Sequence, residues 1–139
     1  MIISAYNEEK VIGKKLLNIT QSDYKNLEII IANDCSDDRT VEIVEDFIKE
    51  NPAYDIKVVT AKNHYGKTNA QNEAAAEATG EILVFSDANS MFKEDAIKEL
   101  VAFFTDPSIE YVCGSLIYAK DDDISSVVAE NTYWDMELR

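Results

Sequence analysis

The chain has few basic side chains for its 139 residues: 13 Lys and Arg stand against 27 Asp and Glu, a formal net charge of −14. Such a surface repels polyanions, so nucleic-acid binding is not expected. An anionic ligand would instead need a local cation, a metal ion or helix N-termini. No apolar run approaches the roughly 20 residues that cross a bilayer, so we expect no membrane span within this chain.

Cysteine and histidine are also scarce, with two cysteines and the single histidine His64. These three residues cannot supply the ligands of a structural zinc site. We expect Cys35 and Cys113 to be free thiols of a cytoplasmic protein. A lone histidine without a partnered nucleophile excludes a Ser-His-Asp site, and we predict that His64 is an ordinary loop residue. The glycines form neither Gly-x-Gly-x-x-Gly nor a P-loop, which excludes those dinucleotide and ATP motifs.

Apolar runs alternate with helical patterns along the chain. The runs begin at Ile2, Leu27, Ile56, Ile82 and Tyr111. Helical stripes occupy residues 11–19, 41–48, 67–78 and 97–104. Each gap between strands is long enough for a crossover helix, so the pattern predicts an α/β fold with a mainly parallel sheet and helices on both faces.

Finer features of these elements are predicted as well. The runs 27–32 and 82–85 are almost wholly apolar, as strands covered on both faces should be. Gly80 is expected to cap the third helix, and Pro107 to stop the fourth. Asp121 to Asp123 read as a solvated loop, and residues 125–139 as a helix. We expect residues 1–139 to form a single, truncated domain, because both ends are abrupt.

Polar clusters follow each of the first four predicted strands. They are residues 4–9, 33–38, 63–67 and 86–89. In open α/β sheets ligands bind beyond the carboxyl ends of the strands, where these clusters should meet. A turn needs one or two polar residues, not four converging sets, so the pattern predicts a functional edge.

Two residues of these clusters suit a nucleobase. Asp34 follows an apolar strand, where its carboxylate can accept a hydrogen bond from a base imide. Its alternative role is to cap the next helix, but residues 36–38 serve that purpose equally well. Tyr6 can stack on a base ring, and alternatively is a half-buried aromatic side chain.

Three further residues suit a diphosphate and a metal ion. Lys67 lies at a helix start, where a cation is unfavourable unless an anion lies there too, although it can also be an exposed surface lysine. Asp87 and Asn89, at positions i and i+2, can both reach Mg²⁺ or Mn²⁺. Asp and Asn are also common in ordinary turns.

Taken together, these motifs resemble the family 2 glycosyltransferases. The resemblance is carried in order by Ser4-Ala5-Tyr6-Asn7-Glu8-Glu9, by residues 27–40, by Gly66-Lys67 with Asn72, and by residues 80–89 leading into an Asp-x-Asp-like motif. It covers nearly the whole chain and implies a Rossmann-like GT-A fold. The tail with Tyr133, Trp134 and Glu137 is similar to membrane-anchored polysaccharide synthases.

The resemblance implies inverting transfer of a sugar from a nucleotide-sugar donor, expected to be a UDP-sugar, to a saccharide or lipid-linked acceptor. Asp87 and Asn89 would hold the divalent metal, and Lys67 would approach the diphosphate. The substrate-binding residues would be Ser4, Ala5, Tyr6, Glu8, Asp34, Lys67, Asp87, Ala88 and Asn89. Asn89 stands where the family usually has Asp, which puts metal use in doubt. The family's catalytic base lies beyond this chain, so we expect no catalytic residue here and no activity of the fragment alone.

Other functions stay open at this point. A sugar-phosphate nucleotidyltransferase would want a Gly- and Arg-rich loop after the first strand, where residues 6–9 stand instead. A degenerate module that binds a nucleotide sugar without turnover is compatible with Asn89 and the missing base. A phosphoacceptor receiver domain would want an acidic pair after its first strand and a lysine after its fifth, and neither is present.

Overall fold

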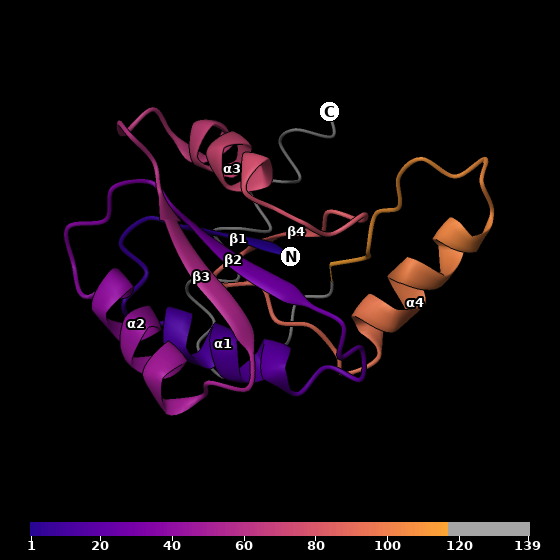
Figure 1. The fold of residues 1–139 in the computed structure, drawn as a ribbon, viewed down its shortest axis with the longest axis horizontal. Helices are drawn as coiled ribbons and strands as arrows, with labels where there is room; N and C mark the ends of the chain where they lie inside the picture. Colours follow the sequence, from indigo (N-terminus) through magenta and orange to yellow (C-terminus); the bar gives the residue numbers. More distant parts are fainter. Residues whose placement is uncertain (117–139) are drawn as a thin grey trace.

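The computed structural model describes residues 1–116, which form alternating strands and helices (Figure 1). In chain order the elements are β1 (Ile2–Ala5), α1 (Ile12–Thr20), β2 (Glu28–Asn33), α2 (Thr40–Glu50), β3 (Asp55–Thr60), α3 (Lys67–Ala76), β4 (Phe85–Asp87), α4 (Ala96–Ala102) and the 3-10 turn η1 (Phe103–Thr105). None of the helices within residues 1–116 is long and apolar enough to cross a bilayer.

The four strands form one parallel sheet in the order β3-β2-β1-β4. In the register of this sheet, Ile3 of the central strand β1 pairs with Ile31 of β2 and with Ser86 of β4. The chain winds outward from β1 to β3 and then returns to the other side of β1. This reversal makes the carboxyl ends of β1 and β4 a topological switch point, the usual place for a ligand crevice.

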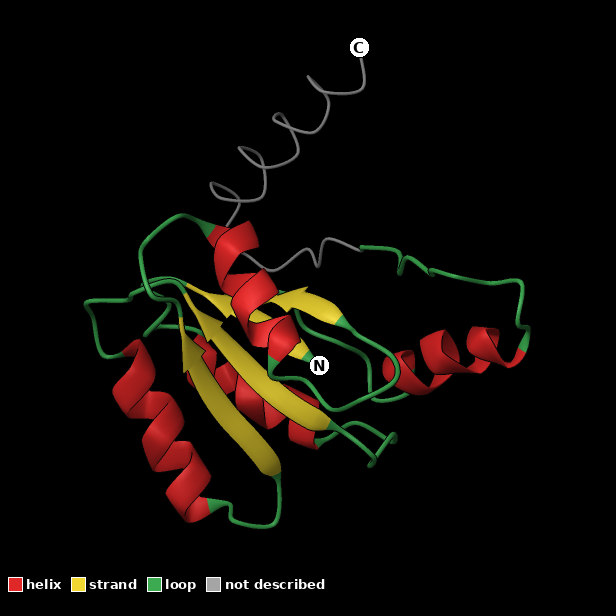
Figure 2. Ribbon diagram, turned by 45° about the horizontal axis from the view of Figure 1, so that its top comes forward, coloured by secondary structure: helices red, strands yellow, loops and turns green. Residues whose placement is uncertain are grey.

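Helices cover both faces of the sheet, as the sequence predicts (Figure 2). On one face α1, α2 and α4 pack on the sheet through large aliphatic side chains such as Ile12, Leu16 and Ile97. On the other face α3 lies against the sheet through the small side chains of Ala70 and Ala74. Small residues let this helix approach closely, and its first turn lies near the carboxyl ends of the strands.

The fourth strand differs from its prediction in length and in burial. It begins at Phe85 rather than Ile82, although Ile2 N still donates to Val84 O at 2.8 Å. The predicted cover on both faces is wrong, because Leu83 is 42% and Phe85 50% exposed. The physical reason is position: β4 is an edge strand of the described sheet, and α3 packs over β1, β2 and β3.

The fifth strand and one helix end are also corrected. Residues 111–116 form no regular structure, and Tyr111 is 86% exposed, so the strand predicted to begin there is absent from these residues. Helix α3 ends at Ala76, and Glu77 rather than Gly80 holds the C-cap position with right-handed backbone. Helix α4 and η1 do end before Pro107, as expected. The predictions for residues 121–123 and 125–139 lie outside the described residues.

Candidate functional site

The four predicted polar clusters converge on one pocket of about 420 Å³ at the carboxyl edge of the sheet. Its lining comes from the ends of β1, β2 and β4, from the loops that follow the strands and from the start of α3, and comprises Ser4, Ala5, Tyr6, Glu8, Ala32, Asp34, His64, Gly66, Lys67, Asp87 and Asn89. Every substrate residue expected from the sequence lines it except Ala88. The side chain of Ala88 is buried in the core beneath, so its predicted contact with substrate is not supported by the geometry.

The loops after β1 and β2 hold each other in place. Asn7 takes a left-handed backbone conformation with φ 55°, and its Oδ1 accepts a hydrogen bond from Asp37 N at 3.0 Å. In return Asn7 N donates to Ser36 Oγ at 3.0 Å, and Glu8 N donates to Thr40 Oγ1 at 2.8 Å. These reciprocal bonds fix the wall of the pocket that carries Tyr6 and Glu8.

Asp34 is a buried carboxylate that the helix does not use. Thr40 N, in the first turn of α2, donates to Asp38 Oδ1 at 2.9 Å, so a different residue performs the capping. The side chain of Asp34 is only 5% exposed, and its Oδ1 is buried without a hydrogen-bond partner. A buried acceptor normally finds a donor, so this oxygen marks a place where a ligand donor would be favourable.

His64 belongs to the site, which corrects the prediction that it is an ordinary loop residue. Its ring stacks on Tyr6 with centroids 4.4 Å apart and an angle of 29° between the planes. Its Nδ1 lies 2.9 Å from Asp34 Oδ2 and 2.9 Å from Asp34 O. No local sequence signal indicates these contacts, since the partners are 58 and 30 positions away and meet only in the folded sheet.

The opposite side of the pocket carries exposed charges. Lys67 begins α3 directly after Gly66, whose φ of 90° is a conformation that suits glycine. Lys67 Nζ lies 2.5 Å from Asp87 Oδ1, and the two side chains are 54% and 47% exposed. On the wall that carries Tyr6, burial raises the pKa of Glu8, and the charges of Asp38 and Asp87 raise it further.

Lys15 supports this side of the pocket from within the core. It is fully buried, and its Nζ donates to Ser86 Oγ at 2.7 Å and to Ser90 O while lying 4.5 Å from the centre of the Phe92 ring. Burial lowers the pKa of Lys15 to about 8, opposed by the negative charge of Asp87. Lys15 is not among the functional residues predicted from the sequence. Its position three residues after Ile12, within the apolar stripe of the helix, could have indicated that its side chain is buried.

A second missed residue is Gln71 of α3, whose Nε2 donates to Ser4 Oγ at 2.9 Å. This bond ties the end of β1 to the helix that begins with Lys67. It joins the strand that presents Tyr6 to the helix that presents the pocket's cation, so both walls of the pocket share one support.

The oxygen donors of Glu8, Asp87 and Asn89 suit a hard cation such as Mg²⁺ or Mn²⁺. No group of three or more His, Cys, Asp or Glu residues capable of holding a metal occurs within residues 1–116. Mg²⁺ is commonly bound through one or two carboxylates together with substrate phosphates, so this donor set fits a cation that arrives with a diphosphate.

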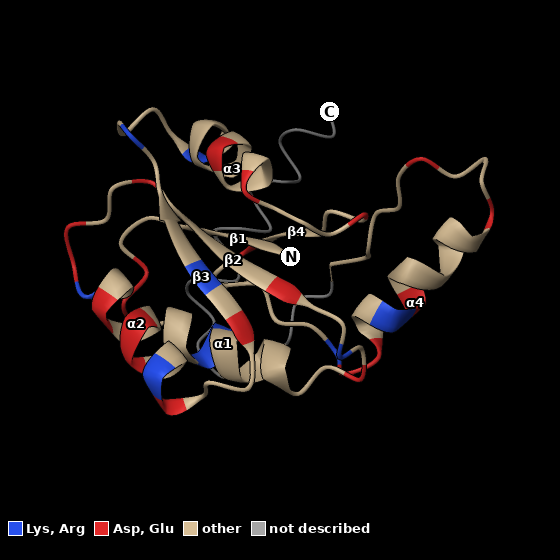
Figure 3. Ribbon diagram, in the orientation of Figure 1, with Lys and Arg blue, Asp and Glu red and all other residues tan. Residues whose placement is uncertain are grey.

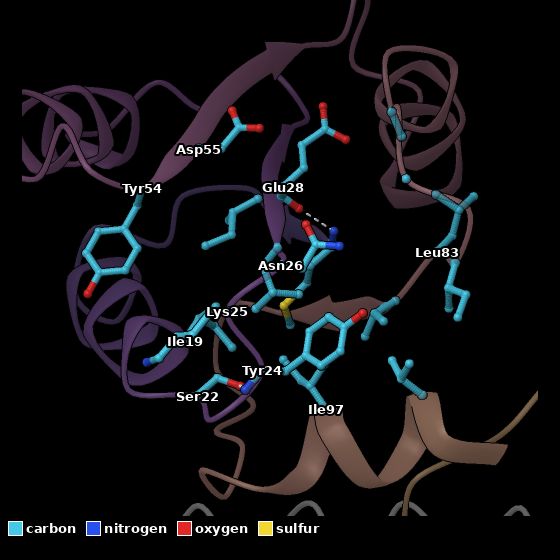
Figure 4. A pocket seen from close by; sticks show the side chains of 18 of the residues that line it. Ile19, Ser22, Tyr24, Lys25, Asn26, Glu28, Tyr54, Asp55, Leu83 and Ile97 are labelled. Atoms are coloured by element: carbon cyan, nitrogen blue, oxygen red, sulfur yellow. Dashed lines mark hydrogen bonds between the residues drawn. The ribbon is translucent and has the colours of Figure 1, made fainter. Parts of the chain in front are cut away.

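A larger hollow of about 570 Å³ lies at the opposite, amino end of the strands (Figure 4). Among its lining residues, Glu28 is already paired: it accepts hydrogen bonds from Lys57 Nζ at 2.8 Å and from Thr79 N at 2.8 Å. These partners lower the pKa of Glu28 to about 2. Since the sheet's switch point lies at the other edge, we assign the functional site to the pocket at the carboxyl edge.

Comparisons with known proteins agree with this architecture. The sequence model described as Glycosyl transferase family 2 matches residues 1–138, and the chain belongs to this family. It is 33% identical over 115 residues to a poly-beta-1,6-N-acetyl-D-glucosamine synthase of Staphylococcus epidermidis, and equally to one of Staphylococcus aureus strain COL. These alignments cover 82% of this chain and 27% of each synthase, so the chain spans about a quarter of their length.

Solved glycosyltransferases share the fold. A mannosyltransferase, PcManGT from Pyrobaculum calidifontis, in complex with GDP-Man and Mn²⁺, superposes with a TM-score of 0.75 and 32% identity over 78% of this chain and 32% of its own. TarS residues 1–349 of S. aureus, in complex with UDP-GlcNAc, superposes with a TM-score of 0.67 and 26% identity over 85% of this chain and 36% of its own. The fold is therefore the GT-A fold expected from the sequence.

Proposed function

We propose that this chain is the nucleotide-sugar-binding part of an inverting glycosyltransferase that uses a UDP-sugar. The observation that carries the proposal is the carboxylate of Asp34. It is buried, it does not cap a helix, and it lines the pocket at the switch point together with the aromatic ring of Tyr6. Ser4, Tyr6 and Asp34 hold the base, and Asp34 accepts from the uracil N3–H. Family membership and the relatives with bound nucleotide sugars support this assignment.

The diphosphate lies on the side of Lys67. The ammonium group of Lys67 exchanges its ion pair with Asp87 for the phosphate oxygens, and Asp87 and Asn89 would hold a divalent cation there. Bound there, the cation would neutralise charge on the departing diphosphate. The Mn²⁺ in the complex of PcManGT supports such metal use.

The reaction is a single in-line displacement at the anomeric carbon. The acceptor hydroxyl oxygen forms the new bond to this carbon as the bond to the nucleoside diphosphate breaks, and a general base takes the hydroxyl proton. From the resemblance to the family we expect that base outside residues 1–139, so in this proposal the chain binds the donor without transferring the sugar.

The synthases of similar sequence support a proposal for the acceptor and for the cellular location. We infer a saccharide or lipid-linked acceptor, because the relatives with 33% identity are polysaccharide synthases. In this proposal the domain works in the cytoplasm, as part of a longer protein anchored at the membrane. A sugar-transfer assay with membranes that contain the complete protein tests this part of the proposal.

Calorimetric titration with UDP, GDP and ADP tests the base pocket. We expect UDP to bind more tightly than ADP, because adenine offers no ring N–H at the corresponding edge. Losing a hydrogen bond to a buried charged acceptor costs about 1.5–3 kcal/mol, so Asp34→Ala should weaken UDP roughly tenfold to a hundredfold and ADP far less.

Two results would contradict the proposal. Equal affinities for ADP and UDP, unchanged by Asp34→Ala, would show that the base pocket is misassigned. Sugar transfer by the 139-residue chain would show that it contains its own base. Tighter binding of GDP than UDP would keep the nucleotide-sugar function and change the donor, since guanine also presents a ring N–H.

A further inference from the structure

The side chain of His64 makes two contacts that a nucleobase needs. Its ring lies against Tyr6, and its Nδ1 approaches two oxygens of Asp34 at 2.9 Å each. Both oxygens are acceptors, so Nδ1 carries the hydrogen and donates it. A flat nitrogen heterocycle thus stacks on the tyrosine and donates N–H to the carboxylate.

The stacking on Tyr6 and the donation to the Asp34 carboxylate are the contacts that the proposed function gives to uracil. We propose that His64 occupies the base subsite of the free protein and competes there with the nucleobase for Tyr6 and Asp34. The inference rests on the proposed function, because it takes Tyr6 and Asp34 as the residues that hold the base.

The burial of Asp34 explains why its carboxylate needs a hydrogen-bond donor even in the free protein. A buried carboxylate without donors is costly, and Oδ1 already lacks a partner. His64 supplies the donor to Oδ2 in the absence of ligand. When a base arrives with its own N–H, the carboxylate exchanges one donor for another, and the hydrogen-bond contact given up is the one between His64 Nδ1 and the main-chain oxygen of Asp34.

His64 is also placed where it can leave. The residue lies in the connection between β3 and α3 and lines the pocket, and its side chain is 53% exposed. Among residues 1–116 the hydrogen-bond partners of the His64 side chain are Asp34 Oδ2 and Asp34 O. Rotation of the side chain breaks the carboxylate contact and the ring stacking, which the base replaces, and the contact with Asp34 O, which it does not replace.

Competition of this kind sets both affinity and selectivity. The apparent dissociation constant equals the intrinsic one divided by the fraction of protein in which His64 has swung away. A ligand that lacks a donor for Asp34 cannot compensate for the loss of the histidine contact. Its affinity is therefore lower than it would be for a pocket in which His64 did not occupy the base subsite.

Because the chain has one histidine, NMR reports on it directly if the protein is purified without a histidine tag. In the free protein we expect the imidazole C–H signals to be displaced by the Tyr6 ring current and to show cross-relaxation with the Tyr6 ring. Saturating UDP should abolish that cross-relaxation. Its persistence with UDP bound would overturn the inference.

The matched variants are His64→Ala and His64→Phe, titrated with UDP beside the wild type. For His64→Ala we expect severalfold to tenfold tighter UDP binding together with a lower Tm of the free protein, because Asp34 loses its donor. His64→Phe keeps the stacking ring but not the donor, and it should tighten UDP less. A purely structural histidine would lower both stability and affinity, and this outcome overturns the inference.

The Asp34→Ala titration separates this inference from the proposed function. UDP binding that depends on Asp34 but weakens or stays constant in both His64 variants would refute the competition and keep the base pocket. An absence of UDP binding in every variant would refute both.

Discussion

The two halves of the pocket are built differently. The base half, made by Tyr6, Asp34 and His64, centres on a carboxylate that is 5% exposed. The phosphate half, made by Lys67, Asp87 and Asn89, is open, with the first two side chains 54% and 47% exposed. A hydrogen bond to a buried charge is worth more than a screened ion pair at the surface. The base half should therefore dominate affinity, while the phosphate half depends on charge and salt.

The difference begins in the sheet. Tyr6 and Asp34 of the base half follow β1 and β2, neighbours in the centre of the sheet, whereas Asp87 and Asn89 of the phosphate half lie at the end of β4, a three-residue edge strand. Acidic segments lie on several elements across the molecule (Figure 3), so the diphosphate meets a generally repulsive surface. The phosphate half therefore needs local cations, one in the pocket and one buried beneath it.

The buried cation gives the largest expected effect. Lys15→Ala removes a fully buried side chain and leaves Ser86 Oγ and Ser90 O without their donor, so we expect a loss of about 2–5 kcal/mol in the free energy of unfolding. Urea denaturation measures it. The control is Lys14→Ala, an exposed neighbour with the same charge change, expected to cost less than about 0.5 kcal/mol. Equal costs for the two variants would contradict the support role of Lys15.

The same lysine predicts a pH dependence of stability. Its pKa falls from 10.5 to about 8 on folding, so between these values the unfolded chain binds more protons. The free energy of unfolding should therefore rise with pH across this window, by at most about 1.4 kcal/mol per pH unit from this group. Lys15→Met lacks the group, and the difference between wild type and variant isolates its contribution. A difference that stays constant from pH 8 to pH 10 would contradict the lowered pKa.

Some residues of the pocket can be predicted from the sequence and others cannot. Asp34 and Asp87 can be predicted from the sequence because they lie at strand ends, and parallel strands bring their carboxyl ends together. His64 and Lys15 cannot, because their roles depend on tertiary contacts with Tyr6 and with Ser86, which lie 58 and 71 positions away. The strand at Tyr111 was predicted wrongly, and the sequence did not indicate that the side chain of Ala88 is buried, for a related reason: apolar pattern and motif spacing do not say which way a side chain faces or whether an edge strand forms.

The cation in the pocket should separate the two halves. Lys67→Ala is expected to weaken UDP roughly tenfold while leaving uridine binding nearly unchanged, because the nucleoside lacks the diphosphate. The effect should shrink at high salt, since the side chain is half exposed. Lys62→Ala, an exposed lysine of the same connection, provides the matched control and should barely affect UDP. If Lys67→Ala weakened uridine as much as UDP, the assignment of the two halves would fail.

The smallest expected effect, a severalfold change, tests the metal position. Asn89→Asp adds a carboxylate beside Asp87, and a hard cation prefers such a ligand to an amide oxygen. With Mn²⁺ present the variant should bind UDP more tightly than wild type, and Asn89→Ala should bind it less tightly. Without metal the effect on affinity reverses, and Asn89→Asp should bind UDP less tightly than wild type, because the added negative charge then repels the diphosphate.

Asn26→Asp, at the far edge of the sheet, makes the same change of charge and should show no dependence on Mn²⁺. Calorimetry with and without Mn²⁺ measures all four combinations of the two Asp variants with metal. Tighter binding by Asn89→Asp in the absence of metal would mean that the diphosphate lies elsewhere, since no added carboxylate can attract it directly.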